Sequence, residues 1–187
     1  MNQTISKKKE VNGVDVTALH DTLNAVREKP ELAAFKFRAT NKWQGGTLNR
    51  SKIGGFYGAG EEHPDRPDAF VFTADEPQVL LGQDRGANPV EFLLHAAAAC
   101  ATTTMIAHAA ARGIQLEEVE SVIEGDIDLR GFLGLDPKIK KGFQGIRLAF
   151  RVKSDAPAEQ LRELTYMSPV INTIKEPTSI EITVEKK

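Results

Sequence analysis

The sequence NPVEFLLHAAAACATTTMIAHAAARG, residues Asn88 to Gly113, decides the fold of this chain. Its first residues have the chemistry that starts an α-helix. Asn88 can act as the N-cap, Pro89 suits the first helical position, and Glu91 completes a capping box. At the other end, Arg112 favours the negative end of the helix dipole and Gly113 can adopt the left-handed conformation that ends a helix. The segment is apolar nearly all round, which predicts one long helix that is buried on most of its faces.

The length of this segment also matches a membrane-spanning helix. However, it contains Glu91, His95 and His108, together with three successive threonines at Thr102–Thr104, and no aromatic belt flanks it. We therefore interpret it as the central helix of a globular domain.

The composition restricts the class of protein. The chain has 187 residues, 41% of them hydrophobic, which is enough for one domain with a substantial core. The formal net charge of −2 shows no basic excess of the kind that points to nucleic acid or to an anionic membrane surface. No apolar segment follows the N-terminal lysine run, so this run is not a secretory signal. The single cysteine, Cys100, cannot form an intrachain disulfide, and we expect a cytoplasmic protein with a free thiol.

Residues 1–30 are predicted to form an N-terminal extension with one short amphipathic helix, and residues 31–187 the main domain. Strand patterns occur on both sides of the central helix, and polar loops are expected at Glu61–Asp68 and Gly131–Gly142. The predicted strands are Phe35–Phe37, Thr47–Ile53, Ala69–Thr73, Val119–Leu129, Ile146–Val152 and Ile180–Val184. Two helices, opened by Asp155 with Pro157 and by Ser168 with Pro169, precede the last strand. This order predicts an α+β fold with a mainly antiparallel sheet.

The two strands that follow the central helix carry opposite charges on alternate residues. Acidic residues alternate from Glu118 to Asp128, and Arg147 and Arg151 alternate with apolar residues on the second strand. We expect these charges to pair across the sheet.

Three segments resemble the OsmC/Ohr superfamily, the osmotically inducible and organic-hydroperoxide-resistance proteins. They are NPVEFLLHAAAAC, ARGIQLEEVE and MSPVINTI, and the resemblance extends from about Ala34 to Val184. It implies an OsmC-like fold, with mainly antiparallel sheets around a long central helix, in an intertwined homodimer whose active sites lie at the dimer interface. It also implies reduction of organic hydroperoxides by a thiol. No metal, other cofactor, nucleic-acid partner or membrane partner is expected.

The resemblance assigns roles to individual residues. Cys100 lies where the family's attacking cysteine belongs, and Ser168 lies where its second, resolving cysteine belongs. An external thiol reductant would therefore replace the internal disulfide step. Arg50 is the candidate for the arginine that holds the thiolate, with Arg38 and Arg85 as rivals.

Glu91 is the candidate for the supporting glutamate, although the family's best-studied members carry it one residue earlier, where this chain has Val90. An α-helix turns about 100° per residue, so the nine residues from Glu91 to Cys100 place the two side chains about half a turn apart. Capping of its own helix is therefore the preferred role of Glu91, and catalysis is the alternative.

Two histidines lie on the same helix as Cys100. His108 is about 12 Å away along the helix axis, and neither His95 nor His108 has the i, i+4 spacing from Cys100 that a metal site on one helix face requires. We expect both to make polar contacts near the dimer interface. The hydroxyl groups of Thr102–Thr104 either bond back to helix carbonyls or line a pocket beside Cys100.

Two functions from different classes are consistent with these residues. The first is a hydroperoxide reductase in oxidative-stress defence, in which Cys100 is the one working cysteine and an external thiol recycles it. The second is a non-catalytic dimer that binds a small apolar ligand at its interface, with Cys100 as an ordinary buried residue. The fold alone does not decide between them, because function depends on the site.

Overall fold

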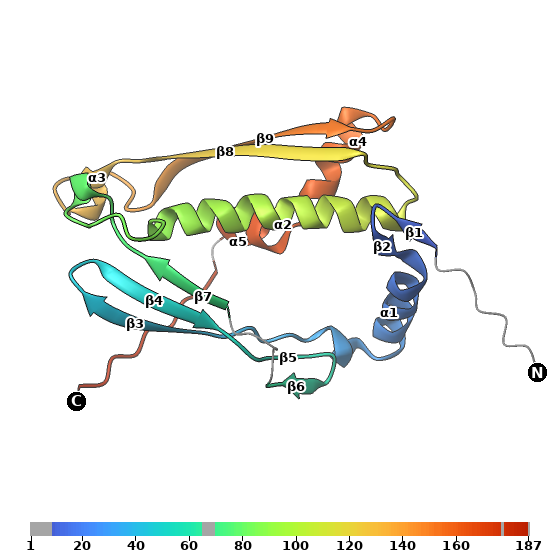
Figure 1. Ribbon diagram of the computed structural model, residues 1–187, viewed down its shortest axis with the longest axis horizontal. Helices are drawn as coiled ribbons and strands as arrows, with labels where there is room; N and C mark the ends of the chain where they lie inside the picture. Colours follow the sequence, from blue (N-terminus) through green and yellow to red (C-terminus); the bar gives the residue numbers. More distant parts are fainter. Residues whose placement is uncertain (1–8, 65–69, 177, 187) are drawn as a thin grey trace, which may run out of the picture. The chain divides into compact units, whose positions relative to one another are not determined.

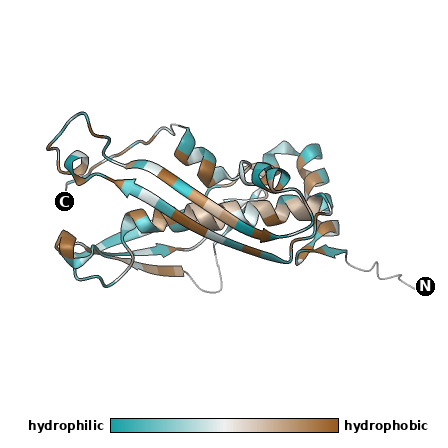
Figure 2. Cartoon of the chain, turned by 90° about the horizontal axis from the view of Figure 1, so that it is seen from above, coloured by the Kyte–Doolittle hydropathy of each residue, from teal (hydrophilic) through white to brown (hydrophobic). Residues whose placement is uncertain are grey.

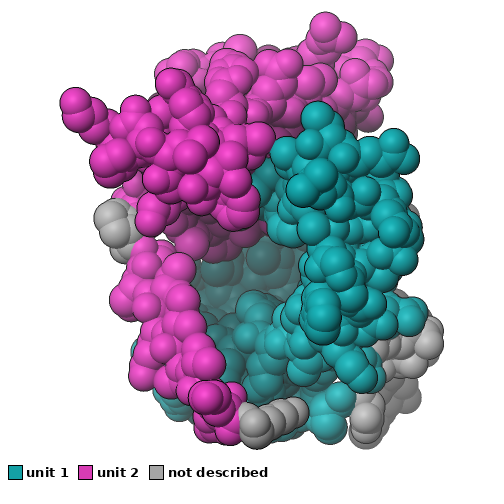
Figure 3. Space-filling view, turned by 90° about the vertical axis from the view of Figure 1, so that its left-hand side faces the viewer, with its two compact units in different colours: residues 1–93 teal, residues 94–187 magenta. Residues whose placement is uncertain are grey.

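A computed structural model describes residues 9–64, 70–176 and 178–186 of the chain. The chain forms two compact units, residues 1–93 and 94–187, which Figure 3 colours separately. The predicted α+β class is confirmed, and every ladder between the described strands is antiparallel.

The first unit begins with a small hairpin and one helix (Figure 1). Strands β1 (Glu10–Val11) and β2 (Val14–Asp15) pair, and helix α1 (Val16–Glu28) follows. The carboxylate of Asp15 accepts a hydrogen bond of 3.0 Å from the backbone N–H of Ala18 and so caps α1. A short 3₁₀ helix, η1 (Pro30–Ala33), comes next. The short N-terminal helix predicted from the sequence is therefore confirmed.

A three-stranded sheet in the order β3–β4–β7 forms the main part of the first unit. Its strands are Ala39–Gly45, Leu48–Ile53 and Phe70–Ala74. Gly45, the last residue of β3, and Gly46, in the turn before β4, both have positive φ, a conformation that glycine adopts without a steric penalty. The helix η2 (Gln78–Leu80) follows β7.

Two predictions for this region were wrong. The segment Phe35–Phe37 is not a strand, because only Lys36 forms a bridge, to Tyr57. The ring of Phe35 instead stacks with those of Phe37 and Phe56, and the rings of Phe37 and Phe56 pack at a tilt. The predicted loop Glu61–Asp68 begins with strand β6 (Glu61–His63), which pairs with β5 (Phe56–Gly58); residues 65–68 lie outside the described part of the chain.

The second unit is built on the β8–β9 ladder. Strand β8 (Glu118–Ile127) pairs with β9 (Phe143–Lys153), and the short helix α3 (Leu129–Phe132) lies in the connection, where the sequence predicted only a loop. Helices α4 (Ala158–Thr165) and α5 (Pro169–Lys175) follow. Polar and apolar residues alternate along both strands (Figure 2).

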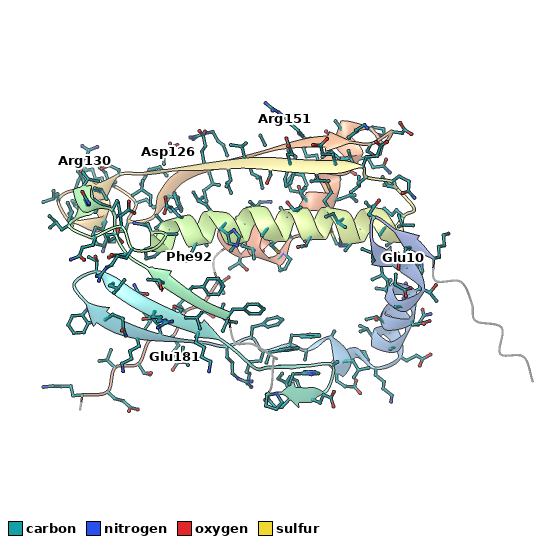
Figure 4. The ribbon with its side chains drawn as sticks, in the orientation of Figure 1. Glu10, Phe92, Asp126, Arg130, Arg151 and Glu181 are labelled. Atoms are coloured by element: carbon teal, nitrogen blue, oxygen red, sulfur yellow. The ribbon has the colours of Figure 1, made fainter. Side chains whose placement is uncertain are left out.

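The predicted pairing of charges across this ladder is confirmed. Glu124 lies opposite Arg147, and Glu120 lies opposite Arg151. The guanidinium of Arg147 forms ion pairs with Glu124, at 3.5 Å, and with Asp126. Asp126 and Arg151 point away from helix α2 (Figure 4), so this is the solvated face of the ladder.

Helix α2 (Pro89–Ala111) is the long helix predicted from the sequence, and Gly113 beyond its end has φ of +70°. The opposite face of the ladder packs with α2 and α4 around a core of Met105, Ala109, Leu161 and Leu164. By length and hydropathy, α2 is the one helix in the described residues that is long and apolar enough to cross a membrane, a criterion that core helices also meet.

The prediction that α2 is buried on most faces was wrong for the single chain. One line of residues at i, i+4 spacing is fully buried: Ala97, Ala101, Met105 and Ala109. A second line at the same spacing is exposed: Glu91, His95, Ala99 and Thr103. The helix therefore has one covered face and one open face.

The predicted closing strand Ile180–Val184 also differs from the structure. Residues 178–186 join no ladder with any described strand. Ile180, Ile182 and Val184 are 81–86% exposed, although their alternation with polar residues is typical of a strand with one buried face. The pattern is present, but this chain alone supplies no partner for it within the described residues.

Candidate functional site

Cys100 lies in the middle of α2 and is partly exposed. It lies three residues after Ala97 and one before Ala101, which both belong to the buried line of the helix. Cys100 is therefore at the border between the covered and the open face. Within the described part of its own unit, no hydrogen bond or ion pair joins its Sγ to another side chain, so a group that activates the thiol must come from elsewhere.

The threonines beside Cys100 bond to the helix itself. The hydroxyl of Thr103 donates to the carbonyl of Ala99, at 3.0 Å, and to that of Cys100, at 3.1 Å. The hydroxyl of Thr102 donates to the carbonyl of Ala98, at 2.9 Å. Of the two expectations for these residues, the bond back to helix carbonyls is confirmed for both threonines.

The N-terminus of α2 contains the predicted capping box. The backbone N–H of Asn88 donates to the carboxylate of Glu91, at 2.8 Å, and the side chain of Asn88 accepts from the N–H of Val90, at 2.8 Å. The amide of Asn88 also donates to the carboxylate of Glu76. Glu91 therefore has the preferred capping role, and its carboxylate is held at the start of the helix.

The three candidate arginines lie in the first unit, in different surroundings. Arg38 forms a bidentate pair with Glu62, with distances of 2.7 and 2.8 Å. The Nε of Arg85 lies 3.2 Å from the carboxylate of Asp75. Arg50 is exposed and forms no ion pair with any described carboxylate. Of the three, Arg50 alone has a guanidinium that is not already held by a described acidic group.

The sheet register shows which way Arg50 faces. Arg50 lies between Lys42 of β3 and Thr73 of β7, so these three side chains share one face. The neighbouring residue Phe72 therefore lies on the opposite face, where its ring meets that of Phe92 in the first turn of α2, 5.9 Å between centroids. Within the first unit, Arg50 consequently faces away from the start of α2.

Asp75 organises the loop before α2, and sequence reasoning missed it. Its side chain is fully buried and accepts hydrogen bonds from the hydroxyl of Thr47 (2.6 Å), from the Nε of Arg85 (3.2 Å), and from the backbone N–H groups of Glu76, Gln83 and Arg85. The hydrogen bond from Thr47 is the largest cause that holds the pKa of Asp75 far below its usual range, and the bonds from Arg85 and Glu76 add to it. The only sequence signal was an acidic residue two positions after the end of a predicted strand.

No hydrogen bond joins either histidine of α2 to Cys100 within the described residues. His108 lies at the last turn of the helix, where the guanidinium of Arg112 donates to its carbonyl, at 3.0 Å, and approaches its Nδ1, at 3.1 Å. Partial burial and the charge of Arg112 lower the pKa of His108. His95 is exposed on the open line of the helix. In the described residues, no three His, Cys, Asp or Glu side chains are grouped to hold a metal ion.

Ser168, at the position of the family's second cysteine, is fully buried. Its Oγ accepts a hydrogen bond of 3.3 Å from the backbone N–H of Ile171, and Pro169 occupies the first position of α5. The predicted N-cap is therefore confirmed. This serine has a structural role that a cysteine, a weak acceptor, would fill less well.

The second unit also contains a cavity of about 680 Å³, a volume typical of small-molecule sites. Its wall is apolar and comes from α2, β9, α4 and α5: Ala97, Met105, Ile146, Leu148, Phe150, Val152, Ala156, Ala158, Leu161, Ile171 and Ile174. The polar lining residues are Arg162, Thr165, Tyr166 and Lys175. The ammonium of Lys175 lies 5.5 Å from the centre of the Tyr166 ring. Cys100 is not among the lining residues.

Comparisons with solved structures show the same fold in several proteins. An OsmC-like protein from Mycoplasma pneumoniae is 19% identical, with a TM-score of 0.56, over 76% of this chain and 89% of that one. An organic hydroperoxide resistance protein OsmC from Legionella pneumophila is 18% identical, with a TM-score of 0.50, over 74% and 89%. An OsmC-like protein of unknown function from Vibrio cholerae is 14% identical, with a TM-score of 0.50, over 74% and 92%. At these identities the likeness concerns the fold.

The sequence comparisons point the same way. No match was found among curated proteins. The family model for OsmC-like proteins matches residues 82–183, more than half of the chain, from the loop before α2 into the Ile180–Val184 pattern. This range includes both Cys100 and Ser168. The chain belongs to the family of OsmC-like proteins.

Proposed function

We propose that this protein reduces organic hydroperoxides through Cys100 and that an external thiol recycles it, as part of oxidative-stress defence in the cytoplasm. The observation that carries the proposal is the position of Cys100, which is partly exposed on the central helix of an OsmC-like protein. The Legionella pneumophila relative, which has the same fold, is named an organic hydroperoxide resistance protein.

Reduction of a hydroperoxide and recycling of Cys100 take three steps. The thiolate of Cys100 attacks the outer peroxide oxygen of ROOH, the O–O bond breaks, and the products are a sulfenic acid and the alcohol ROH. A thiol from solution then displaces water from the sulfenic acid and forms a mixed disulfide. A second thiol releases Cys100 and leaves as the oxidised disulfide. An internal disulfide is excluded because the chain has one cysteine.

The thiolate needs a neighbouring cation. Among the three candidate arginines, Arg50 is the one that forms no ion pair with a described carboxylate. The rivals Arg38 and Arg85 are paired with Glu62 and Asp75. Arg50, together with Lys42 and Lys52, forms an exposed basic group on one face of its sheet. Because Arg50 faces away from the start of α2 within its own unit, we propose that it supports the thiolate of a second copy of the chain. Glu91 acts indirectly, by fixing the start of the helix that carries Cys100.

We propose a homodimer as the active form. The open line of α2 and the unpaired segment Ile180–Val184 are both suited to be covered by a second copy. Large aromatic residues such as Phe37 and Trp43 are also about 70% exposed, more than a stable monomer usually leaves in water. Light scattering after size-exclusion chromatography should give twice the 20.5 kDa of one chain; a monomer at all concentrations would contradict the proposal.

Intact mass spectrometry tests the chemistry. Reduced protein is exposed to about one equivalent of an organic hydroperoxide in the presence of a sulfenic-acid trap, and one adduct on Cys100 is expected. Cys100→Ser should give no adduct and no peroxide consumption, whereas Ala99→Ser, a matched change on the exposed line, should retain both. An adduct only at large peroxide excess, or unchanged turnover in Cys100→Ser, would refute the proposal.

The cavity of the second unit favours a second candidate function, the binding of a small apolar ligand. Most of its lining residues are aliphatic or aromatic, which suits a hydrocarbon group. Native mass spectrometry should then show a copurified ligand that is lost in Leu148→Trp, where the larger side chain fills the cavity, and kept in the exposed control Ala149→Trp. Retention of the ligand in Leu148→Trp would exclude this cavity as the site.

A further inference from the structure

The connection between β8 and β9 exposes a group of large apolar side chains. We call residues 129–141 the hairpin tip. Leu129, Phe132, Leu133 and Leu135 are between 40% and 71% exposed. Figure 1 places α3, which begins the hairpin tip, at the end of the ladder away from α4. Four apolar side chains that protrude from one short turn are unusual, because isolated exposed residues are common but grouped ones are typical of interaction surfaces.

The same turn carries an excess of positive charge. Lys138, Lys140 and Lys141 are all exposed, and none forms an ion pair with a carboxylate in the described ranges. Between residues 128 and 145 there are four cations and two carboxylates, which leaves a net charge of +2 in a chain whose total is −2. The guanidinium of Arg130 is neutralised by Asp128, at 2.6 Å, so the uncompensated charge belongs to the lysines.

The apolar turn and the lysine segment form one compact structure. A Cβ on Gly131 would lie 2.6 Å from the carbonyl of Lys140 and 2.9 Å from that of Ile139, so the α3 backbone packs directly on the lysine segment. The N–H of Leu135 donates to the carbonyl of Arg130, at 2.9 Å. The side-chain amide of Gln144 donates to the carbonyl of Lys140, at 2.9 Å. The apolar and cationic groups are therefore held side by side before any partner binds.

We propose that the hairpin tip docks the protein reversibly on an anionic lipid bilayer, contrary to the expectation of no membrane partner that the composition of the whole chain gave. Phe132, Leu133 and Leu135 enter the boundary between headgroups and acyl chains, and the three lysines contact lipid phosphates. The uncompensated lysines favour a bilayer as the partner, because an anionic bilayer presents many negative headgroups next to an apolar layer. A symmetric contact between two hairpin tips would instead bring like charges together. Docking of the hairpin tip on lipid does not depend on peroxide reduction at Cys100.

Vesicle sedimentation tests the proposal on the full-length protein. The protein should sediment with vesicles of equimolar phosphatidylcholine and phosphatidylglycerol and remain in solution with phosphatidylcholine alone. Raising the salt from about 0.01 M to about 1 M shortens the Debye length from about 30 Å to about 3 Å, so most of the binding should be lost. Binding that is equal for the two lipid compositions, or no binding to either, would overturn the proposal.

Matched variants locate the binding surface. Each lysine near an anionic surface strengthens binding by about fivefold, so the triple variant Lys138→Gln, Lys140→Gln, Lys141→Gln should weaken it by about 100-fold. The control triple Lys36→Gln, Lys42→Gln, Lys52→Gln removes the same charge from exposed positions of the first unit and should weaken it less than fivefold. Equal losses in the two triples would mean non-specific charge attraction and would overturn the proposal.

A second pair of variants tests the apolar side chains of the hairpin tip. Phe132→Ser with Leu135→Ser should weaken binding by about tenfold or more, while Val79→Ser with Leu81→Ser, apolar residues of the first unit that are even more exposed, should not. Circular dichroism and molecular mass are measured for each variant. If hairpin-tip variants fold but lose dimer mass, the tip is an interface between copies and the proposal is wrong; the lysine triple, which changes only exposed side chains, remains a test if the apolar variant misfolds.

Discussion

Replacing Ser168 by alanine tests whether the residue at the second-cysteine position serves structure or chemistry. Ser168 is fully buried, and its Oγ is the acceptor for the backbone N–H of Ile171, at 3.3 Å. In Ser168→Ala this N–H loses its partner at the first turn of α5. Because the site is closed to solvent, water does not replace the lost acceptor without a rearrangement. We therefore expect a loss of stability and no loss of peroxide turnover per folded molecule.

The size of the effect follows from the cap and from its burial. Loss of a serine N-cap costs about 1 kcal/mol, and burial places the value towards the upper end of the usual range, near 2 kcal/mol. The cavity left by a single hydroxyl adds little. For a chain of 187 residues, 1 kcal/mol shifts the melting temperature by about 2–4 °C, so a loss near 2 kcal/mol lowers it by about 4–8 °C.

Urea unfolding monitored by circular dichroism measures the free energy, and Thr173→Ala is the matched control. Thr173 lies in the same helix and is exposed, and its hydroxyl donates back to the carbonyl of Pro169, so its removal should change the free energy of unfolding by less than about 0.5 kcal/mol. Equal effects of the two changes would refute the capping argument. A turnover loss in Ser168→Ala at full folding would show that the hydroxyl takes part in the chemistry.

Four further outcomes are expected. Leu164→Ala, in the core with Met105, should lower the free energy of unfolding by about 2–5 kcal/mol in urea titrations. Because the pKa of Asp75 is lowered below the ordinary 3.8, its carboxylate stabilises the fold above about pH 4 and this contribution is lost as the pH falls; the stability difference between wild type and Asp75→Asn should therefore shrink in acid. The pKa of His108 is lowered below 6.5, so stability should fall as the pH drops below that value, and Arg112→Ala should raise the pKa in an NMR titration. Gly131→Ala should accelerate amide exchange in the hairpin tip, because its Cβ meets the Lys140 carbonyl.

The features that could be predicted from the sequence are those that depend on neighbours along the chain. The caps at Asn88 and Ser168 lie within three residues of the groups that they bind, and both are present in the structure. The alternating charges of β8 and β9 needed only the two-residue period of a strand. The family resemblance placed Cys100 on the central helix of an OsmC-like fold, which the family match supports.

The features that could not be predicted depend on groups far apart in the sequence. Asp75 receives hydrogen bonds from Thr47, 28 positions earlier, and from Arg85, ten positions later, and no local pattern indicates such a meeting. The same limit applies to Arg50. The face of the sheet on which it lies depends on the register between β4 and β7, which are far apart in the sequence. The cavity could not be predicted either, because its lining residues come from separate helices and strands.

The two wrong predictions that concern burial have a common physical explanation. An apolar helix should be covered on most faces, and an alternating Ile180–Val184 segment should be paired, yet a single chain leaves one line of α2 and the whole segment exposed. Both patterns are typical of surfaces that are buried in the functional form of a protein. Under the proposed homodimer, the second copy supplies the missing cover, and the sequence patterns are correct for the assembly rather than for the isolated chain. The group that activates Cys100, absent from the described part of its own unit, would then be sought on the partner as well.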